Sequence, residues 1–239
     1  MLLSRGLAAL TTLALLSTPA AAQRFYLGAS GGATHVETDY VEQVTREIAR
    51  PWSVNTLEAF DVSTEATGTP GRLFAGIRLS EVFALEADYT RLGDIRSTFK
   101  MRLVQGALGY QQRDTDNEPD AFSIALLAHA RLPHDVSLFG RAGVARTRLK
   151  QAWQVCTDLY SPPNAPRRVD CGSVIRSDVE ETRPVAGLGI DWRFAGRFTL
   201  RASWDRYFGV GKPFVIAGPP DSFGEFDIDY FGVGLTYTF

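Results

Sequence analysis

The chain has 239 residues, a formal net charge of −2 at pH 7, 22 glycines and two cysteines. A near-neutral charge argues against a broad nucleic-acid-binding surface, so no nucleic-acid partner is expected. Two cysteines are too few for a disulfide-rich miniature fold or a four-thiolate zinc site, and no cofactor or metal ion is predicted.

The first residues predict an export signal. One early cation, Arg5, precedes a short apolar run, and Ala20 and Ala22 form an A-x-A cleavage pattern. The run is shorter than the roughly 20 apolar residues that a membrane-spanning helix needs. We therefore expect residues 1–22 to be a cleaved signal peptide and residues 23–239 to form the mature domain.

The mature chain alternates apolar and polar residues with the period of two that is typical of β-strands with two unlike faces. In chain order, the alternating segments are Arg24–Thr34, Arg72–Ser80, Phe83–Gly93, Ala121–Leu132, Val136–Arg146, Pro184–Phe194, Phe198–Tyr207 and Asp229–Phe239. Each of these segments is long enough to cross a bilayer as a tilted strand, which needs about 9–11 residues.

Short and long connections alternate between these segments. The tight ones are Ser80–Val82, Pro133–Asp135 and Ala195–Arg197, and the long polar ones are His35–Gly71, Gly93–Asp120, Leu149–Arg183 and Phe208–Glu225. An up-and-down barrel gathers all such tight turns at one end. The pattern predicts an all-β fold: an eight-stranded antiparallel up-and-down transmembrane β-barrel with short periplasmic turns and four long extracellular loops.

The polar face of the strands argues against the alternative, a soluble lipocalin-like barrel with apolar side chains inside. It mixes glycine with charges of both signs, which suits an eight-strand interior just wide enough for side chains. The expected lumen charge network comprises Arg78, Glu86, Asp88, Arg141, Asp191, Arg201 and Asp205, with Arg193 on the same face. Glu86 and Asp88 should pair with some of the arginines Arg78, Arg141 and Arg201, because an unpaired buried charge is costly.

The apolar face carries no charge at mid-strand positions, as contact with hydrocarbon requires. Its aromatic residues gather at the strand ends, which is typical of lipid-facing barrels because such rings settle at headgroup depth. We expect one girdle of Phe25, Phe83, Trp192, Phe194, Phe198, Tyr237 and Phe239 and a second of Tyr89, Phe122, Trp204 and Phe231.

Three segments carry a resemblance to a known family: "FALEADYTRLGD" (Phe83–Asp94), "LFGRAGVAR" (Leu138–Arg146) and "FGVGLTYTF" (Phe231–Phe239). The chain resembles the OmpA-type eight-stranded outer-membrane barrels, and especially their small single-domain relatives in Gram-negative bacteria. The resemblance implies an integral monomer of the cell outer membrane, in contact with its lipid and lipopolysaccharide. No peptidoglycan-binding domain follows the barrel, so a cell-wall tethering role is not expected.

The resemblance also implies that the last strand is the signal read by the barrel-assembly machinery. The residues that match this signal are Phe231, Val233, Leu235, Tyr237 and Phe239. They place five apolar side chains on one face and end on an aromatic residue.

The segment Ile95–Arg113 has strand character but no clean lipid-facing side. It could add a ninth barrel strand, which would reverse the side on which every later connection lies. We favour strand extensions or a hairpin that projects above the membrane. Cys156 and Cys171 share the third long connection, so a disulfide is the simplest interpretation in an oxidising compartment, with metal binding as the minor alternative.

The residues favour a structural or surface-interaction protein over an enzyme. A lipid-A-modifying barrel enzyme would need a nucleophile beside a base. The histidines are His35, His129 and His134, and none pairs with a serine on the lipid face near the outer rim. No catalytic residue is therefore predicted.

A narrow ion-conducting pore is the other alternative, although side chains fill a barrel of this size. We expect activity to lie in the extracellular loops, which would contact a host or surface ligand.

Overall fold

The computed structural model describes residues 25–37, 57–103, 108–160, 168–212 and 224–239, and the predicted signal peptide lies outside these ranges. Within them every regular element is a β-strand. The strands are β1 (Phe25–Glu37), β2 (Leu57–Thr67), β3 (Gly71–Arg78), β4 (Phe83–Arg91), β5 (Asp94–Leu103), β6 (Leu108–Arg131), β7 (Val136–Tyr160), β8 (Arg168–Cys171), β9 (Ile175–Ala195), β10 (Phe198–Lys212) and β11 (Gly224–Thr238). In the described part of the chain, no helix is long and apolar enough to cross a membrane.

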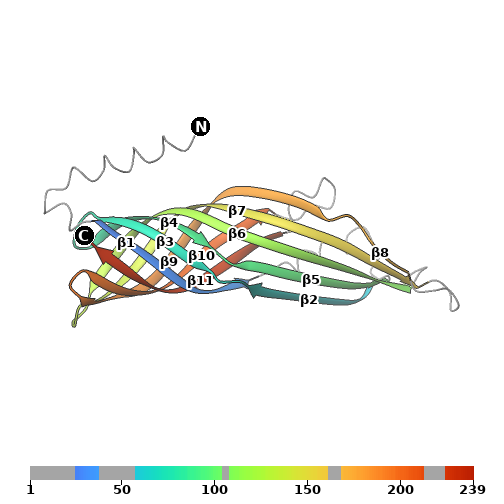
Figure 1. Cartoon of the computed structure of the whole chain (residues 1–239), viewed down its shortest axis with the longest axis horizontal. Coiled ribbons are helices and arrows are strands. Elements are labelled where there is room, and N and C mark those ends of the chain that lie inside the picture. Colours follow the sequence, from blue (N-terminus) through green and yellow to red (C-terminus); the bar gives the residue numbers. More distant parts are fainter. Residues whose placement is uncertain (1–24, 38–56, 104–107, 161–167, 213–223) are drawn as a thin grey trace, which may run out of the picture.

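Eight of these strands close into an antiparallel barrel, which confirms the predicted architecture (Figure 1). The order around the ring is β1, β3, β4, β6, β7, β9, β10 and β11. The ring closes where β1 pairs with β11, from Tyr26↔Thr238 onward. Each ring strand is adjacent to the next one along the chain, so the topology is up-and-down.

A second sheet region projects from one end of the barrel, opposite the C-terminus (Figure 1). We call it the extension: β2, β5 and β8 with the distal parts of β6, β7 and β9. Along one edge of β6, β4 pairs with Ala128–Asp120 and β5 with Asn117–Gly109. β2 then pairs with β5, and β8 pairs with the distal end of β7. This arrangement confirms that Ile95–Arg113 extends the sheet beyond the barrel and adds no ninth barrel strand.

The strands run further into the long connections than the sequence alternation predicts. β6 and β7 pair without a break from Arg131↔Ser137 to Leu108↔Tyr160, and β9 stays paired with β7 as far as Ile175. The physical reason is that an antiparallel ladder satisfies its backbone N–H and C=O groups whatever the side chains are. On β6, for example, the segment Gln111–Asp116 is polar on both faces, yet its ladder with β7 continues.

Short turns of two to four residues join the strands at the other end, which we call the turn end. His134 and Asp135 have φ angles of 63° and 58°, and Gly196 has a φ of 50°. Positive φ at the central residues is the geometry that matches the twist of a tight hairpin. His134 therefore occupies a backbone position set by the turn.

Side chains fill the barrel interior in layers. Near the turn end lies an apolar cluster formed by Tyr26, Phe74, Ala84, Ala125, Leu127 and Phe139. Near the extension lies a second apolar cluster, formed by Leu92, Ile95, Ala121, Ala145, Leu149, Val185, Tyr207, Val210, Phe226, Ile228 and Tyr230. Buried charged residues occupy the lumen alongside these clusters.

Glycine on the inward face leaves room for this filling. An added Cβ at Gly76 would lie 2.1 Å from the Tyr26 ring, and one at Gly187 would lie 2.5 Å from Asp205 Oδ1. The many glycines of the polar face thus reflect a crowded lumen.

Candidate functional site

The outer wall of the barrel presents an uncharged apolar band. Leu73, Ile124, Leu138, Leu188 and Val233 project outward with 47–64% of their surface exposed. Exposed apolar side chains around a whole wall are stable only against lipid or another apolar surface. The band therefore marks the membrane-spanning part of the barrel.

Aromatic residues border this band at both ends. At the turn end, rings contact one another in an arc with centroid separations of 5.2–6.4 Å; its members are Trp192, Phe194, Phe198, Tyr237 and Phe239. Phe25 and Phe83 are exposed at the same end, and Tyr89, Phe122 and Phe231 are exposed at the other. Trp204 is half-buried and donates its indole N–H to Asp229 over 3.0 Å.

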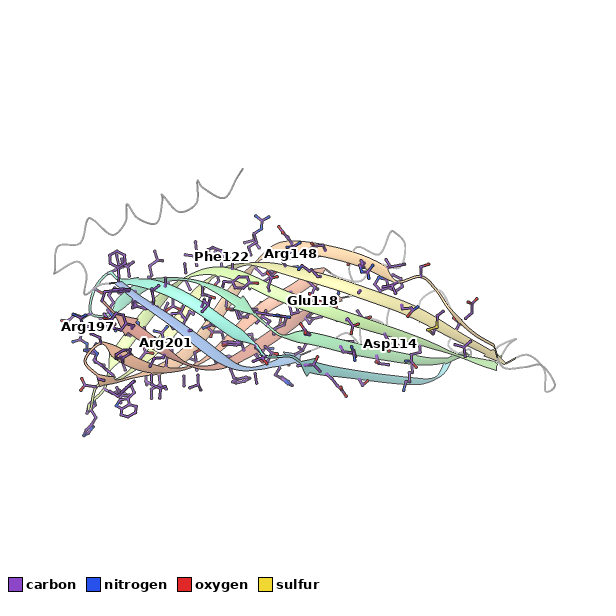
Figure 2. The ribbon with its side chains drawn as sticks, in the orientation of Figure 1. Asp114, Glu118, Phe122, Arg148, Arg197 and Arg201 are labelled. Atoms are coloured by element: carbon purple, nitrogen blue, oxygen red, sulfur yellow. A yellow bond between two sulfur atoms is a disulfide. The ribbon has the colours of Figure 1, made fainter. Side chains whose placement is uncertain are left out.

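The band ends sharply where the extension begins. Along the outward face of β6, Phe122 is followed by Glu118 and Asp114 (Figure 2). Along the same face of β7, Val144 is followed by Arg146 and Arg148. The change from apolar to charged residues on one continuous face sets the membrane boundary at this level.

Within the lumen, Arg201 on β10 is the centre of the layer nearer the turn end. It donates to both oxygens of Asp191 at 2.8 and 3.0 Å and to Glu86 Oε2 at 2.6 Å. Tyr26 donates its hydroxyl to the same Glu86 oxygen at 3.0 Å. The guanidinium carbon lies 4.7 Å from the centroid of the Phe139 ring, so aromatic faces also surround the cation.

A second layer centres on Asp88 and Asp205. Arg141 on β7 pairs with Asp88 and donates to Asp205 Oδ1 at 2.8 Å. Arg72 on β3 donates to Asp205 Oδ2 at 2.6 Å. Ser123 donates to Asp88 at 2.5 Å. The side chains of Arg72, Arg141 and both aspartates are at most 2% exposed, so each charge depends on its partners.

Most of the residues predicted to form the lumen charge network lie in these two layers, but not all of them do. The structure brings six of them into these two layers: Glu86, Asp88, Arg141, Asp191, Arg201 and Asp205. Arg78 and Arg193 lie apart from both layers, beside a cavity at the turn end.

Sequence reasoning missed Arg72. On β3 the arginine that pairs with the lumen carboxylates is Arg72, whereas the sequence predicted Arg78. Its position, six residues before Arg78 on the same strand face, was the available signal. Tyr26, Thr90 and Ser123 were also missed as partners of the charges, because polar residues on a lumen face do not reveal their contacts.

The outward face of the extension carries ion pairs between neighbouring strands. Arg146 pairs with Glu180 at 2.5 Å, Arg148 pairs with Asp178, and Arg96 pairs with Asp116 at 2.8 Å. Hydrogen bonds from Arg148 hold the pKa of Asp178 below its ordinary value. Such exposed pairs contribute little individually, but together they match the strand register.

The inward face of the extension holds a line of buried hydrogen bonds across β5, β6 and β7. Asn117 Nδ2 donates to the Ile95 carbonyl at 3.2 Å, and Gln151 Nε2 donates to Asn117 Oδ1 at 2.8 Å. At the far end, Cys156 on β7 lies opposite Cys171 on β8, and the two form a disulfide, as predicted. The extension is therefore an ordered sheet over its described length.

The histidines lie in three separate places. His35 is exposed on β1, His134 occupies a turn, and the half-buried His129 packs 5.6 Å from the Phe139 ring centroid. In the described part of the chain, none of the three makes a side-chain hydrogen bond. No group of three or more potential metal-ligating side chains occurs among the described residues either.

The residues matched to the assembly signal lie on the last strand, β11, and at the chain end beyond it. Phe231, Val233, Leu235 and Phe239 are exposed on the outer wall, and Tyr237 is half-buried there. The Phe239 backbone N–H donates to the Phe25 carbonyl at 3.1 Å, beside the seam that closes the barrel.

Solved structures similar to this chain include three bacterial proteins. Neisserial surface protein A is 13% identical with a TM-score of 0.41, and the match covers 90% of this chain and 97% of that one. The N-terminal β-barrel domain of OprF from Pseudomonas aeruginosa is 12% identical with a TM-score of 0.42, covering 90% and 98%. Ail from Yersinia pestis is 10% identical with a TM-score of 0.44, covering 90% and 98%.

A comparison with curated protein sequences finds no match. The model of the outer membrane protein β-barrel domain family, however, matches residues 7–239, which is nearly the whole chain. The closed ring, the apolar band and the filled lumen agree with that match. The chain belongs to the outer membrane protein β-barrel domain family and is an integral protein of the outer membrane.

Proposed function

We propose that the protein is a surface-interaction barrel whose contact element is the extension, held outside the cell. The observation that carries this proposal is the continuity of β6, β7 and β9, which have 24, 25 and 21 residues. A strand needs only about 9–11 residues to cross the membrane, so more than half of β6 and β7 stands beyond it. The barrel alone does not require that length.

The extension suits binding because it is preorganised. Ladder hydrogen bonds, the Arg146–Glu180 pair and the Cys156–Cys171 disulfide reduce the conformational freedom that binding would otherwise have to remove. Its outward face mixes both signs of charge, which fits a polar partner such as lipopolysaccharide or a host surface molecule. The contact would be made mainly through polar pairs.

We further propose a route by which the protein reaches the outer membrane. Residues 1–22 direct export and are removed, the barrel-assembly machinery inserts the chain, and the barrel works as a monomer. The apolar, alternating last strand with its terminal Phe239 supports recognition by that machinery.

Neither a pore nor an enzyme is the favoured function. The two charged layers and the apolar clusters occupy the lumen along its length, which supports a barrel closed to solutes. Among the described residues no histidine side chain is hydrogen-bonded to a serine or a carboxylate, so the proposal includes no nucleophile–base pair for acyl transfer. We propose no catalytic role.

The decisive experiment compares three strains of one host. The first lacks the protein, the second carries it unchanged, and the third carries a barrel in which short turns replace the extension at the level of Phe122 and Val144. Adhesion, serum survival and outer-membrane permeability are measured after equal outer-membrane amounts have been verified. We expect the shortened barrel to insert but to leave adhesion or serum survival unrestored. Full restoration would overturn the role of the extension and leave a structural role for the barrel.

A further inference from the structure

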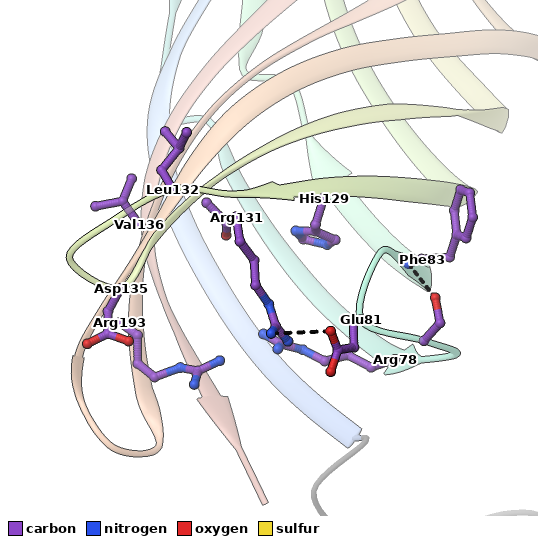
Figure 3. A pocket seen from close by; sticks show the side chains of 11 residues that line it. Arg78, Glu81, Phe83, His129, Arg131, Leu132, Asp135, Val136 and Arg193 are labelled. Carbon is purple, nitrogen blue, oxygen red and sulfur yellow. Dashed lines mark hydrogen bonds and ion pairs between the residues drawn. The ribbon is translucent and has the colours of Figure 1, made fainter.

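A cavity of about 210 Å³ opens at the turn end of the barrel, which is its periplasmic mouth (Figure 3). It lies between the tight turns that follow β3 and β6, away from the extension. Basic groups dominate its polar lining: Arg78, Arg131, Arg193 and His129. The acidic groups in the lining are Glu81 and Asp135.

Two of the arginines in this cavity form no ion pair with an acidic residue in the part of the chain that the structure describes. Arg131 pairs with Glu81 at 3.4 Å, an interaction visible in Figure 3. Within the described ranges, neither Arg78 nor Arg193 forms a salt bridge or a side-chain hydrogen bond. Asp135 is the one remaining carboxylate of the lining, so the cavity keeps an excess of positive charge.

The neighbouring lumen layer does not supply the missing partners. Its carboxylates belong to Glu86 and Asp191, and both are bonded to Arg201. Arg201 is nearly fully buried, whereas Arg193 is exposed and Arg78 is half-buried at the mouth. The two arginines therefore present their donors to the periplasmic side.

The same cavity reaches the edge of the bilayer. Phe83 and Leu132, which are 45% and 44% exposed on the lipid-facing wall, belong to its lining. A ligand bound here would have an anionic group beside the arginines and could place an apolar part against this lip. The cavity is smaller than the about 300–1,000 Å³ of sites for drug-sized molecules, so it suits a single small group.

We propose that this periplasmic cavity is a binding site for a phosphate group, held by Arg78 and Arg193. Guanidinium groups donate paired N–H bonds that match phosphate oxygens, and they stay charged at every physiological pH. The ring N–H of His129 adds a further donor in the lining. The phosphate group belongs either to a phospholipid in the inner leaflet of the outer membrane or to a free phosphate compound in the periplasm.

The test uses the mature, folded barrel in uncharged maltoside micelles with two probes. Inorganic phosphate is titrated by calorimetry, and native mass spectrometry measures retention of phosphatidylglycerol against diacylglycerol, which has no phosphate. Arg193→Gln and Arg78→Gln are compared with Arg197→Gln. Arg197 lies in the last tight turn at the same end, outside the cavity lining, and donates to Tyr237 at 3.0 Å.

We expect Arg193→Gln and Arg78→Gln each to weaken binding by about ten-fold, the effect of losing one charge-assisted hydrogen bond. Arg197→Gln should leave it unchanged. Binding of phosphatidylglycerol alone would support the lipid source, and binding of inorganic phosphate would support the free one. The proposal is overturned if neither probe binds saturably, or if Arg197→Gln weakens binding as much as Arg193→Gln. Because Arg193 is exposed, that variant should fold, which heat-modifiable migration on a gel verifies, and it decides the matter if Arg78→Gln fails to fold.

Discussion

Arg141 and Asp205 form an ion pair across the lumen between strands that are not neighbours. Arg141 Nη1 on β7 donates to Asp205 Oδ1 on β10 over 2.8 Å, while β9 stands between these strands in the wall. Arg72 on β3 binds the other oxygen of the same carboxylate at 2.6 Å. One carboxylate thus joins three separate parts of the barrel wall.

Replacing Arg141 by leucine should destabilise the barrel by about 3–5 kcal/mol, because it leaves buried carboxylates without their cation. Equilibrium urea unfolding in micelles measures this. Arg131→Leu is the control, because its exposed pair with Glu81 should be worth at most about 1 kcal/mol. Equal unfolding free energies for the two variants would contradict a structural role for the network.

Gly187→Ala should also destabilise the barrel, by about 1–3 kcal/mol, because the lumen has no room for a methyl group there. The added Cβ would lie 2.5 Å from both the Trp204 carbonyl oxygen and Asp205 Oδ1. Gly140→Ala is the matched control, since nothing lies within 4 Å of a Cβ added at that position. Thermal unfolding followed by gel mobility distinguishes them, and identical midpoints would mean that the lumen is less crowded than described.

Removing the disulfide with Cys156→Ser and Cys171→Ser should loosen the far end of the extension and leave the barrel intact. Closure of a loop of 15 positions contributes about 3 kcal/mol in chain-entropy models. Limited proteolysis of intact cells, with mapping of the cuts, should show faster cleavage near residues 156–171. A loss of the whole barrel would instead indicate that the disulfide stabilises the membrane-embedded part.

Deleting Phe239 should lower the amount of protein in the outer membrane and raise the amount degraded in the periplasm. The terminal ring contacts Tyr237 at a centroid separation of 5.2 Å and is exposed just beyond the end of β11. Phe239→Tyr keeps an aromatic ring and should assemble normally. Fractionation followed by immunoblotting measures both variants, and unchanged levels after the deletion would count against the assembly signal.

The Arg148–Asp178 pair should make the extension sensitive to acid. Because the folded-state pKa of Asp178 lies below its ordinary value, the pair stabilises fully above the unfolded-state pKa of about 3.9. That stabilisation is lost as the pH falls through the lower folded-state pKa. NMR titration of the Asp178 carboxyl should show the depressed value, and Arg148→Gln should return it to the ordinary range. An unchanged value in the variant would exclude Arg148 as the cause.

Some features of this protein follow from its sequence alone. The period of two in segments such as Phe83–Gly93 predicts the strands, because successive side chains of a strand must face opposite sides. The charge-free apolar face predicts contact with lipid, and the alternation of tight and long connections predicts the up-and-down ring. These properties are local or periodic, so one sequence is enough to reveal them.

Other features are decided only by the tertiary structure. Arg72 and Asp205 are separated by 133 positions, and their meeting depends on strand register and on the diameter of the closed ring. The extension likewise arises from pairing between β2, β5 and β6, and which of these strands are neighbours is not set by the pattern within any one of them. The cavity beside Arg78 and Arg193 exists because two turns distant in the sequence meet at one mouth. Long-range pairing energy, which no local pattern encodes, determines each of these.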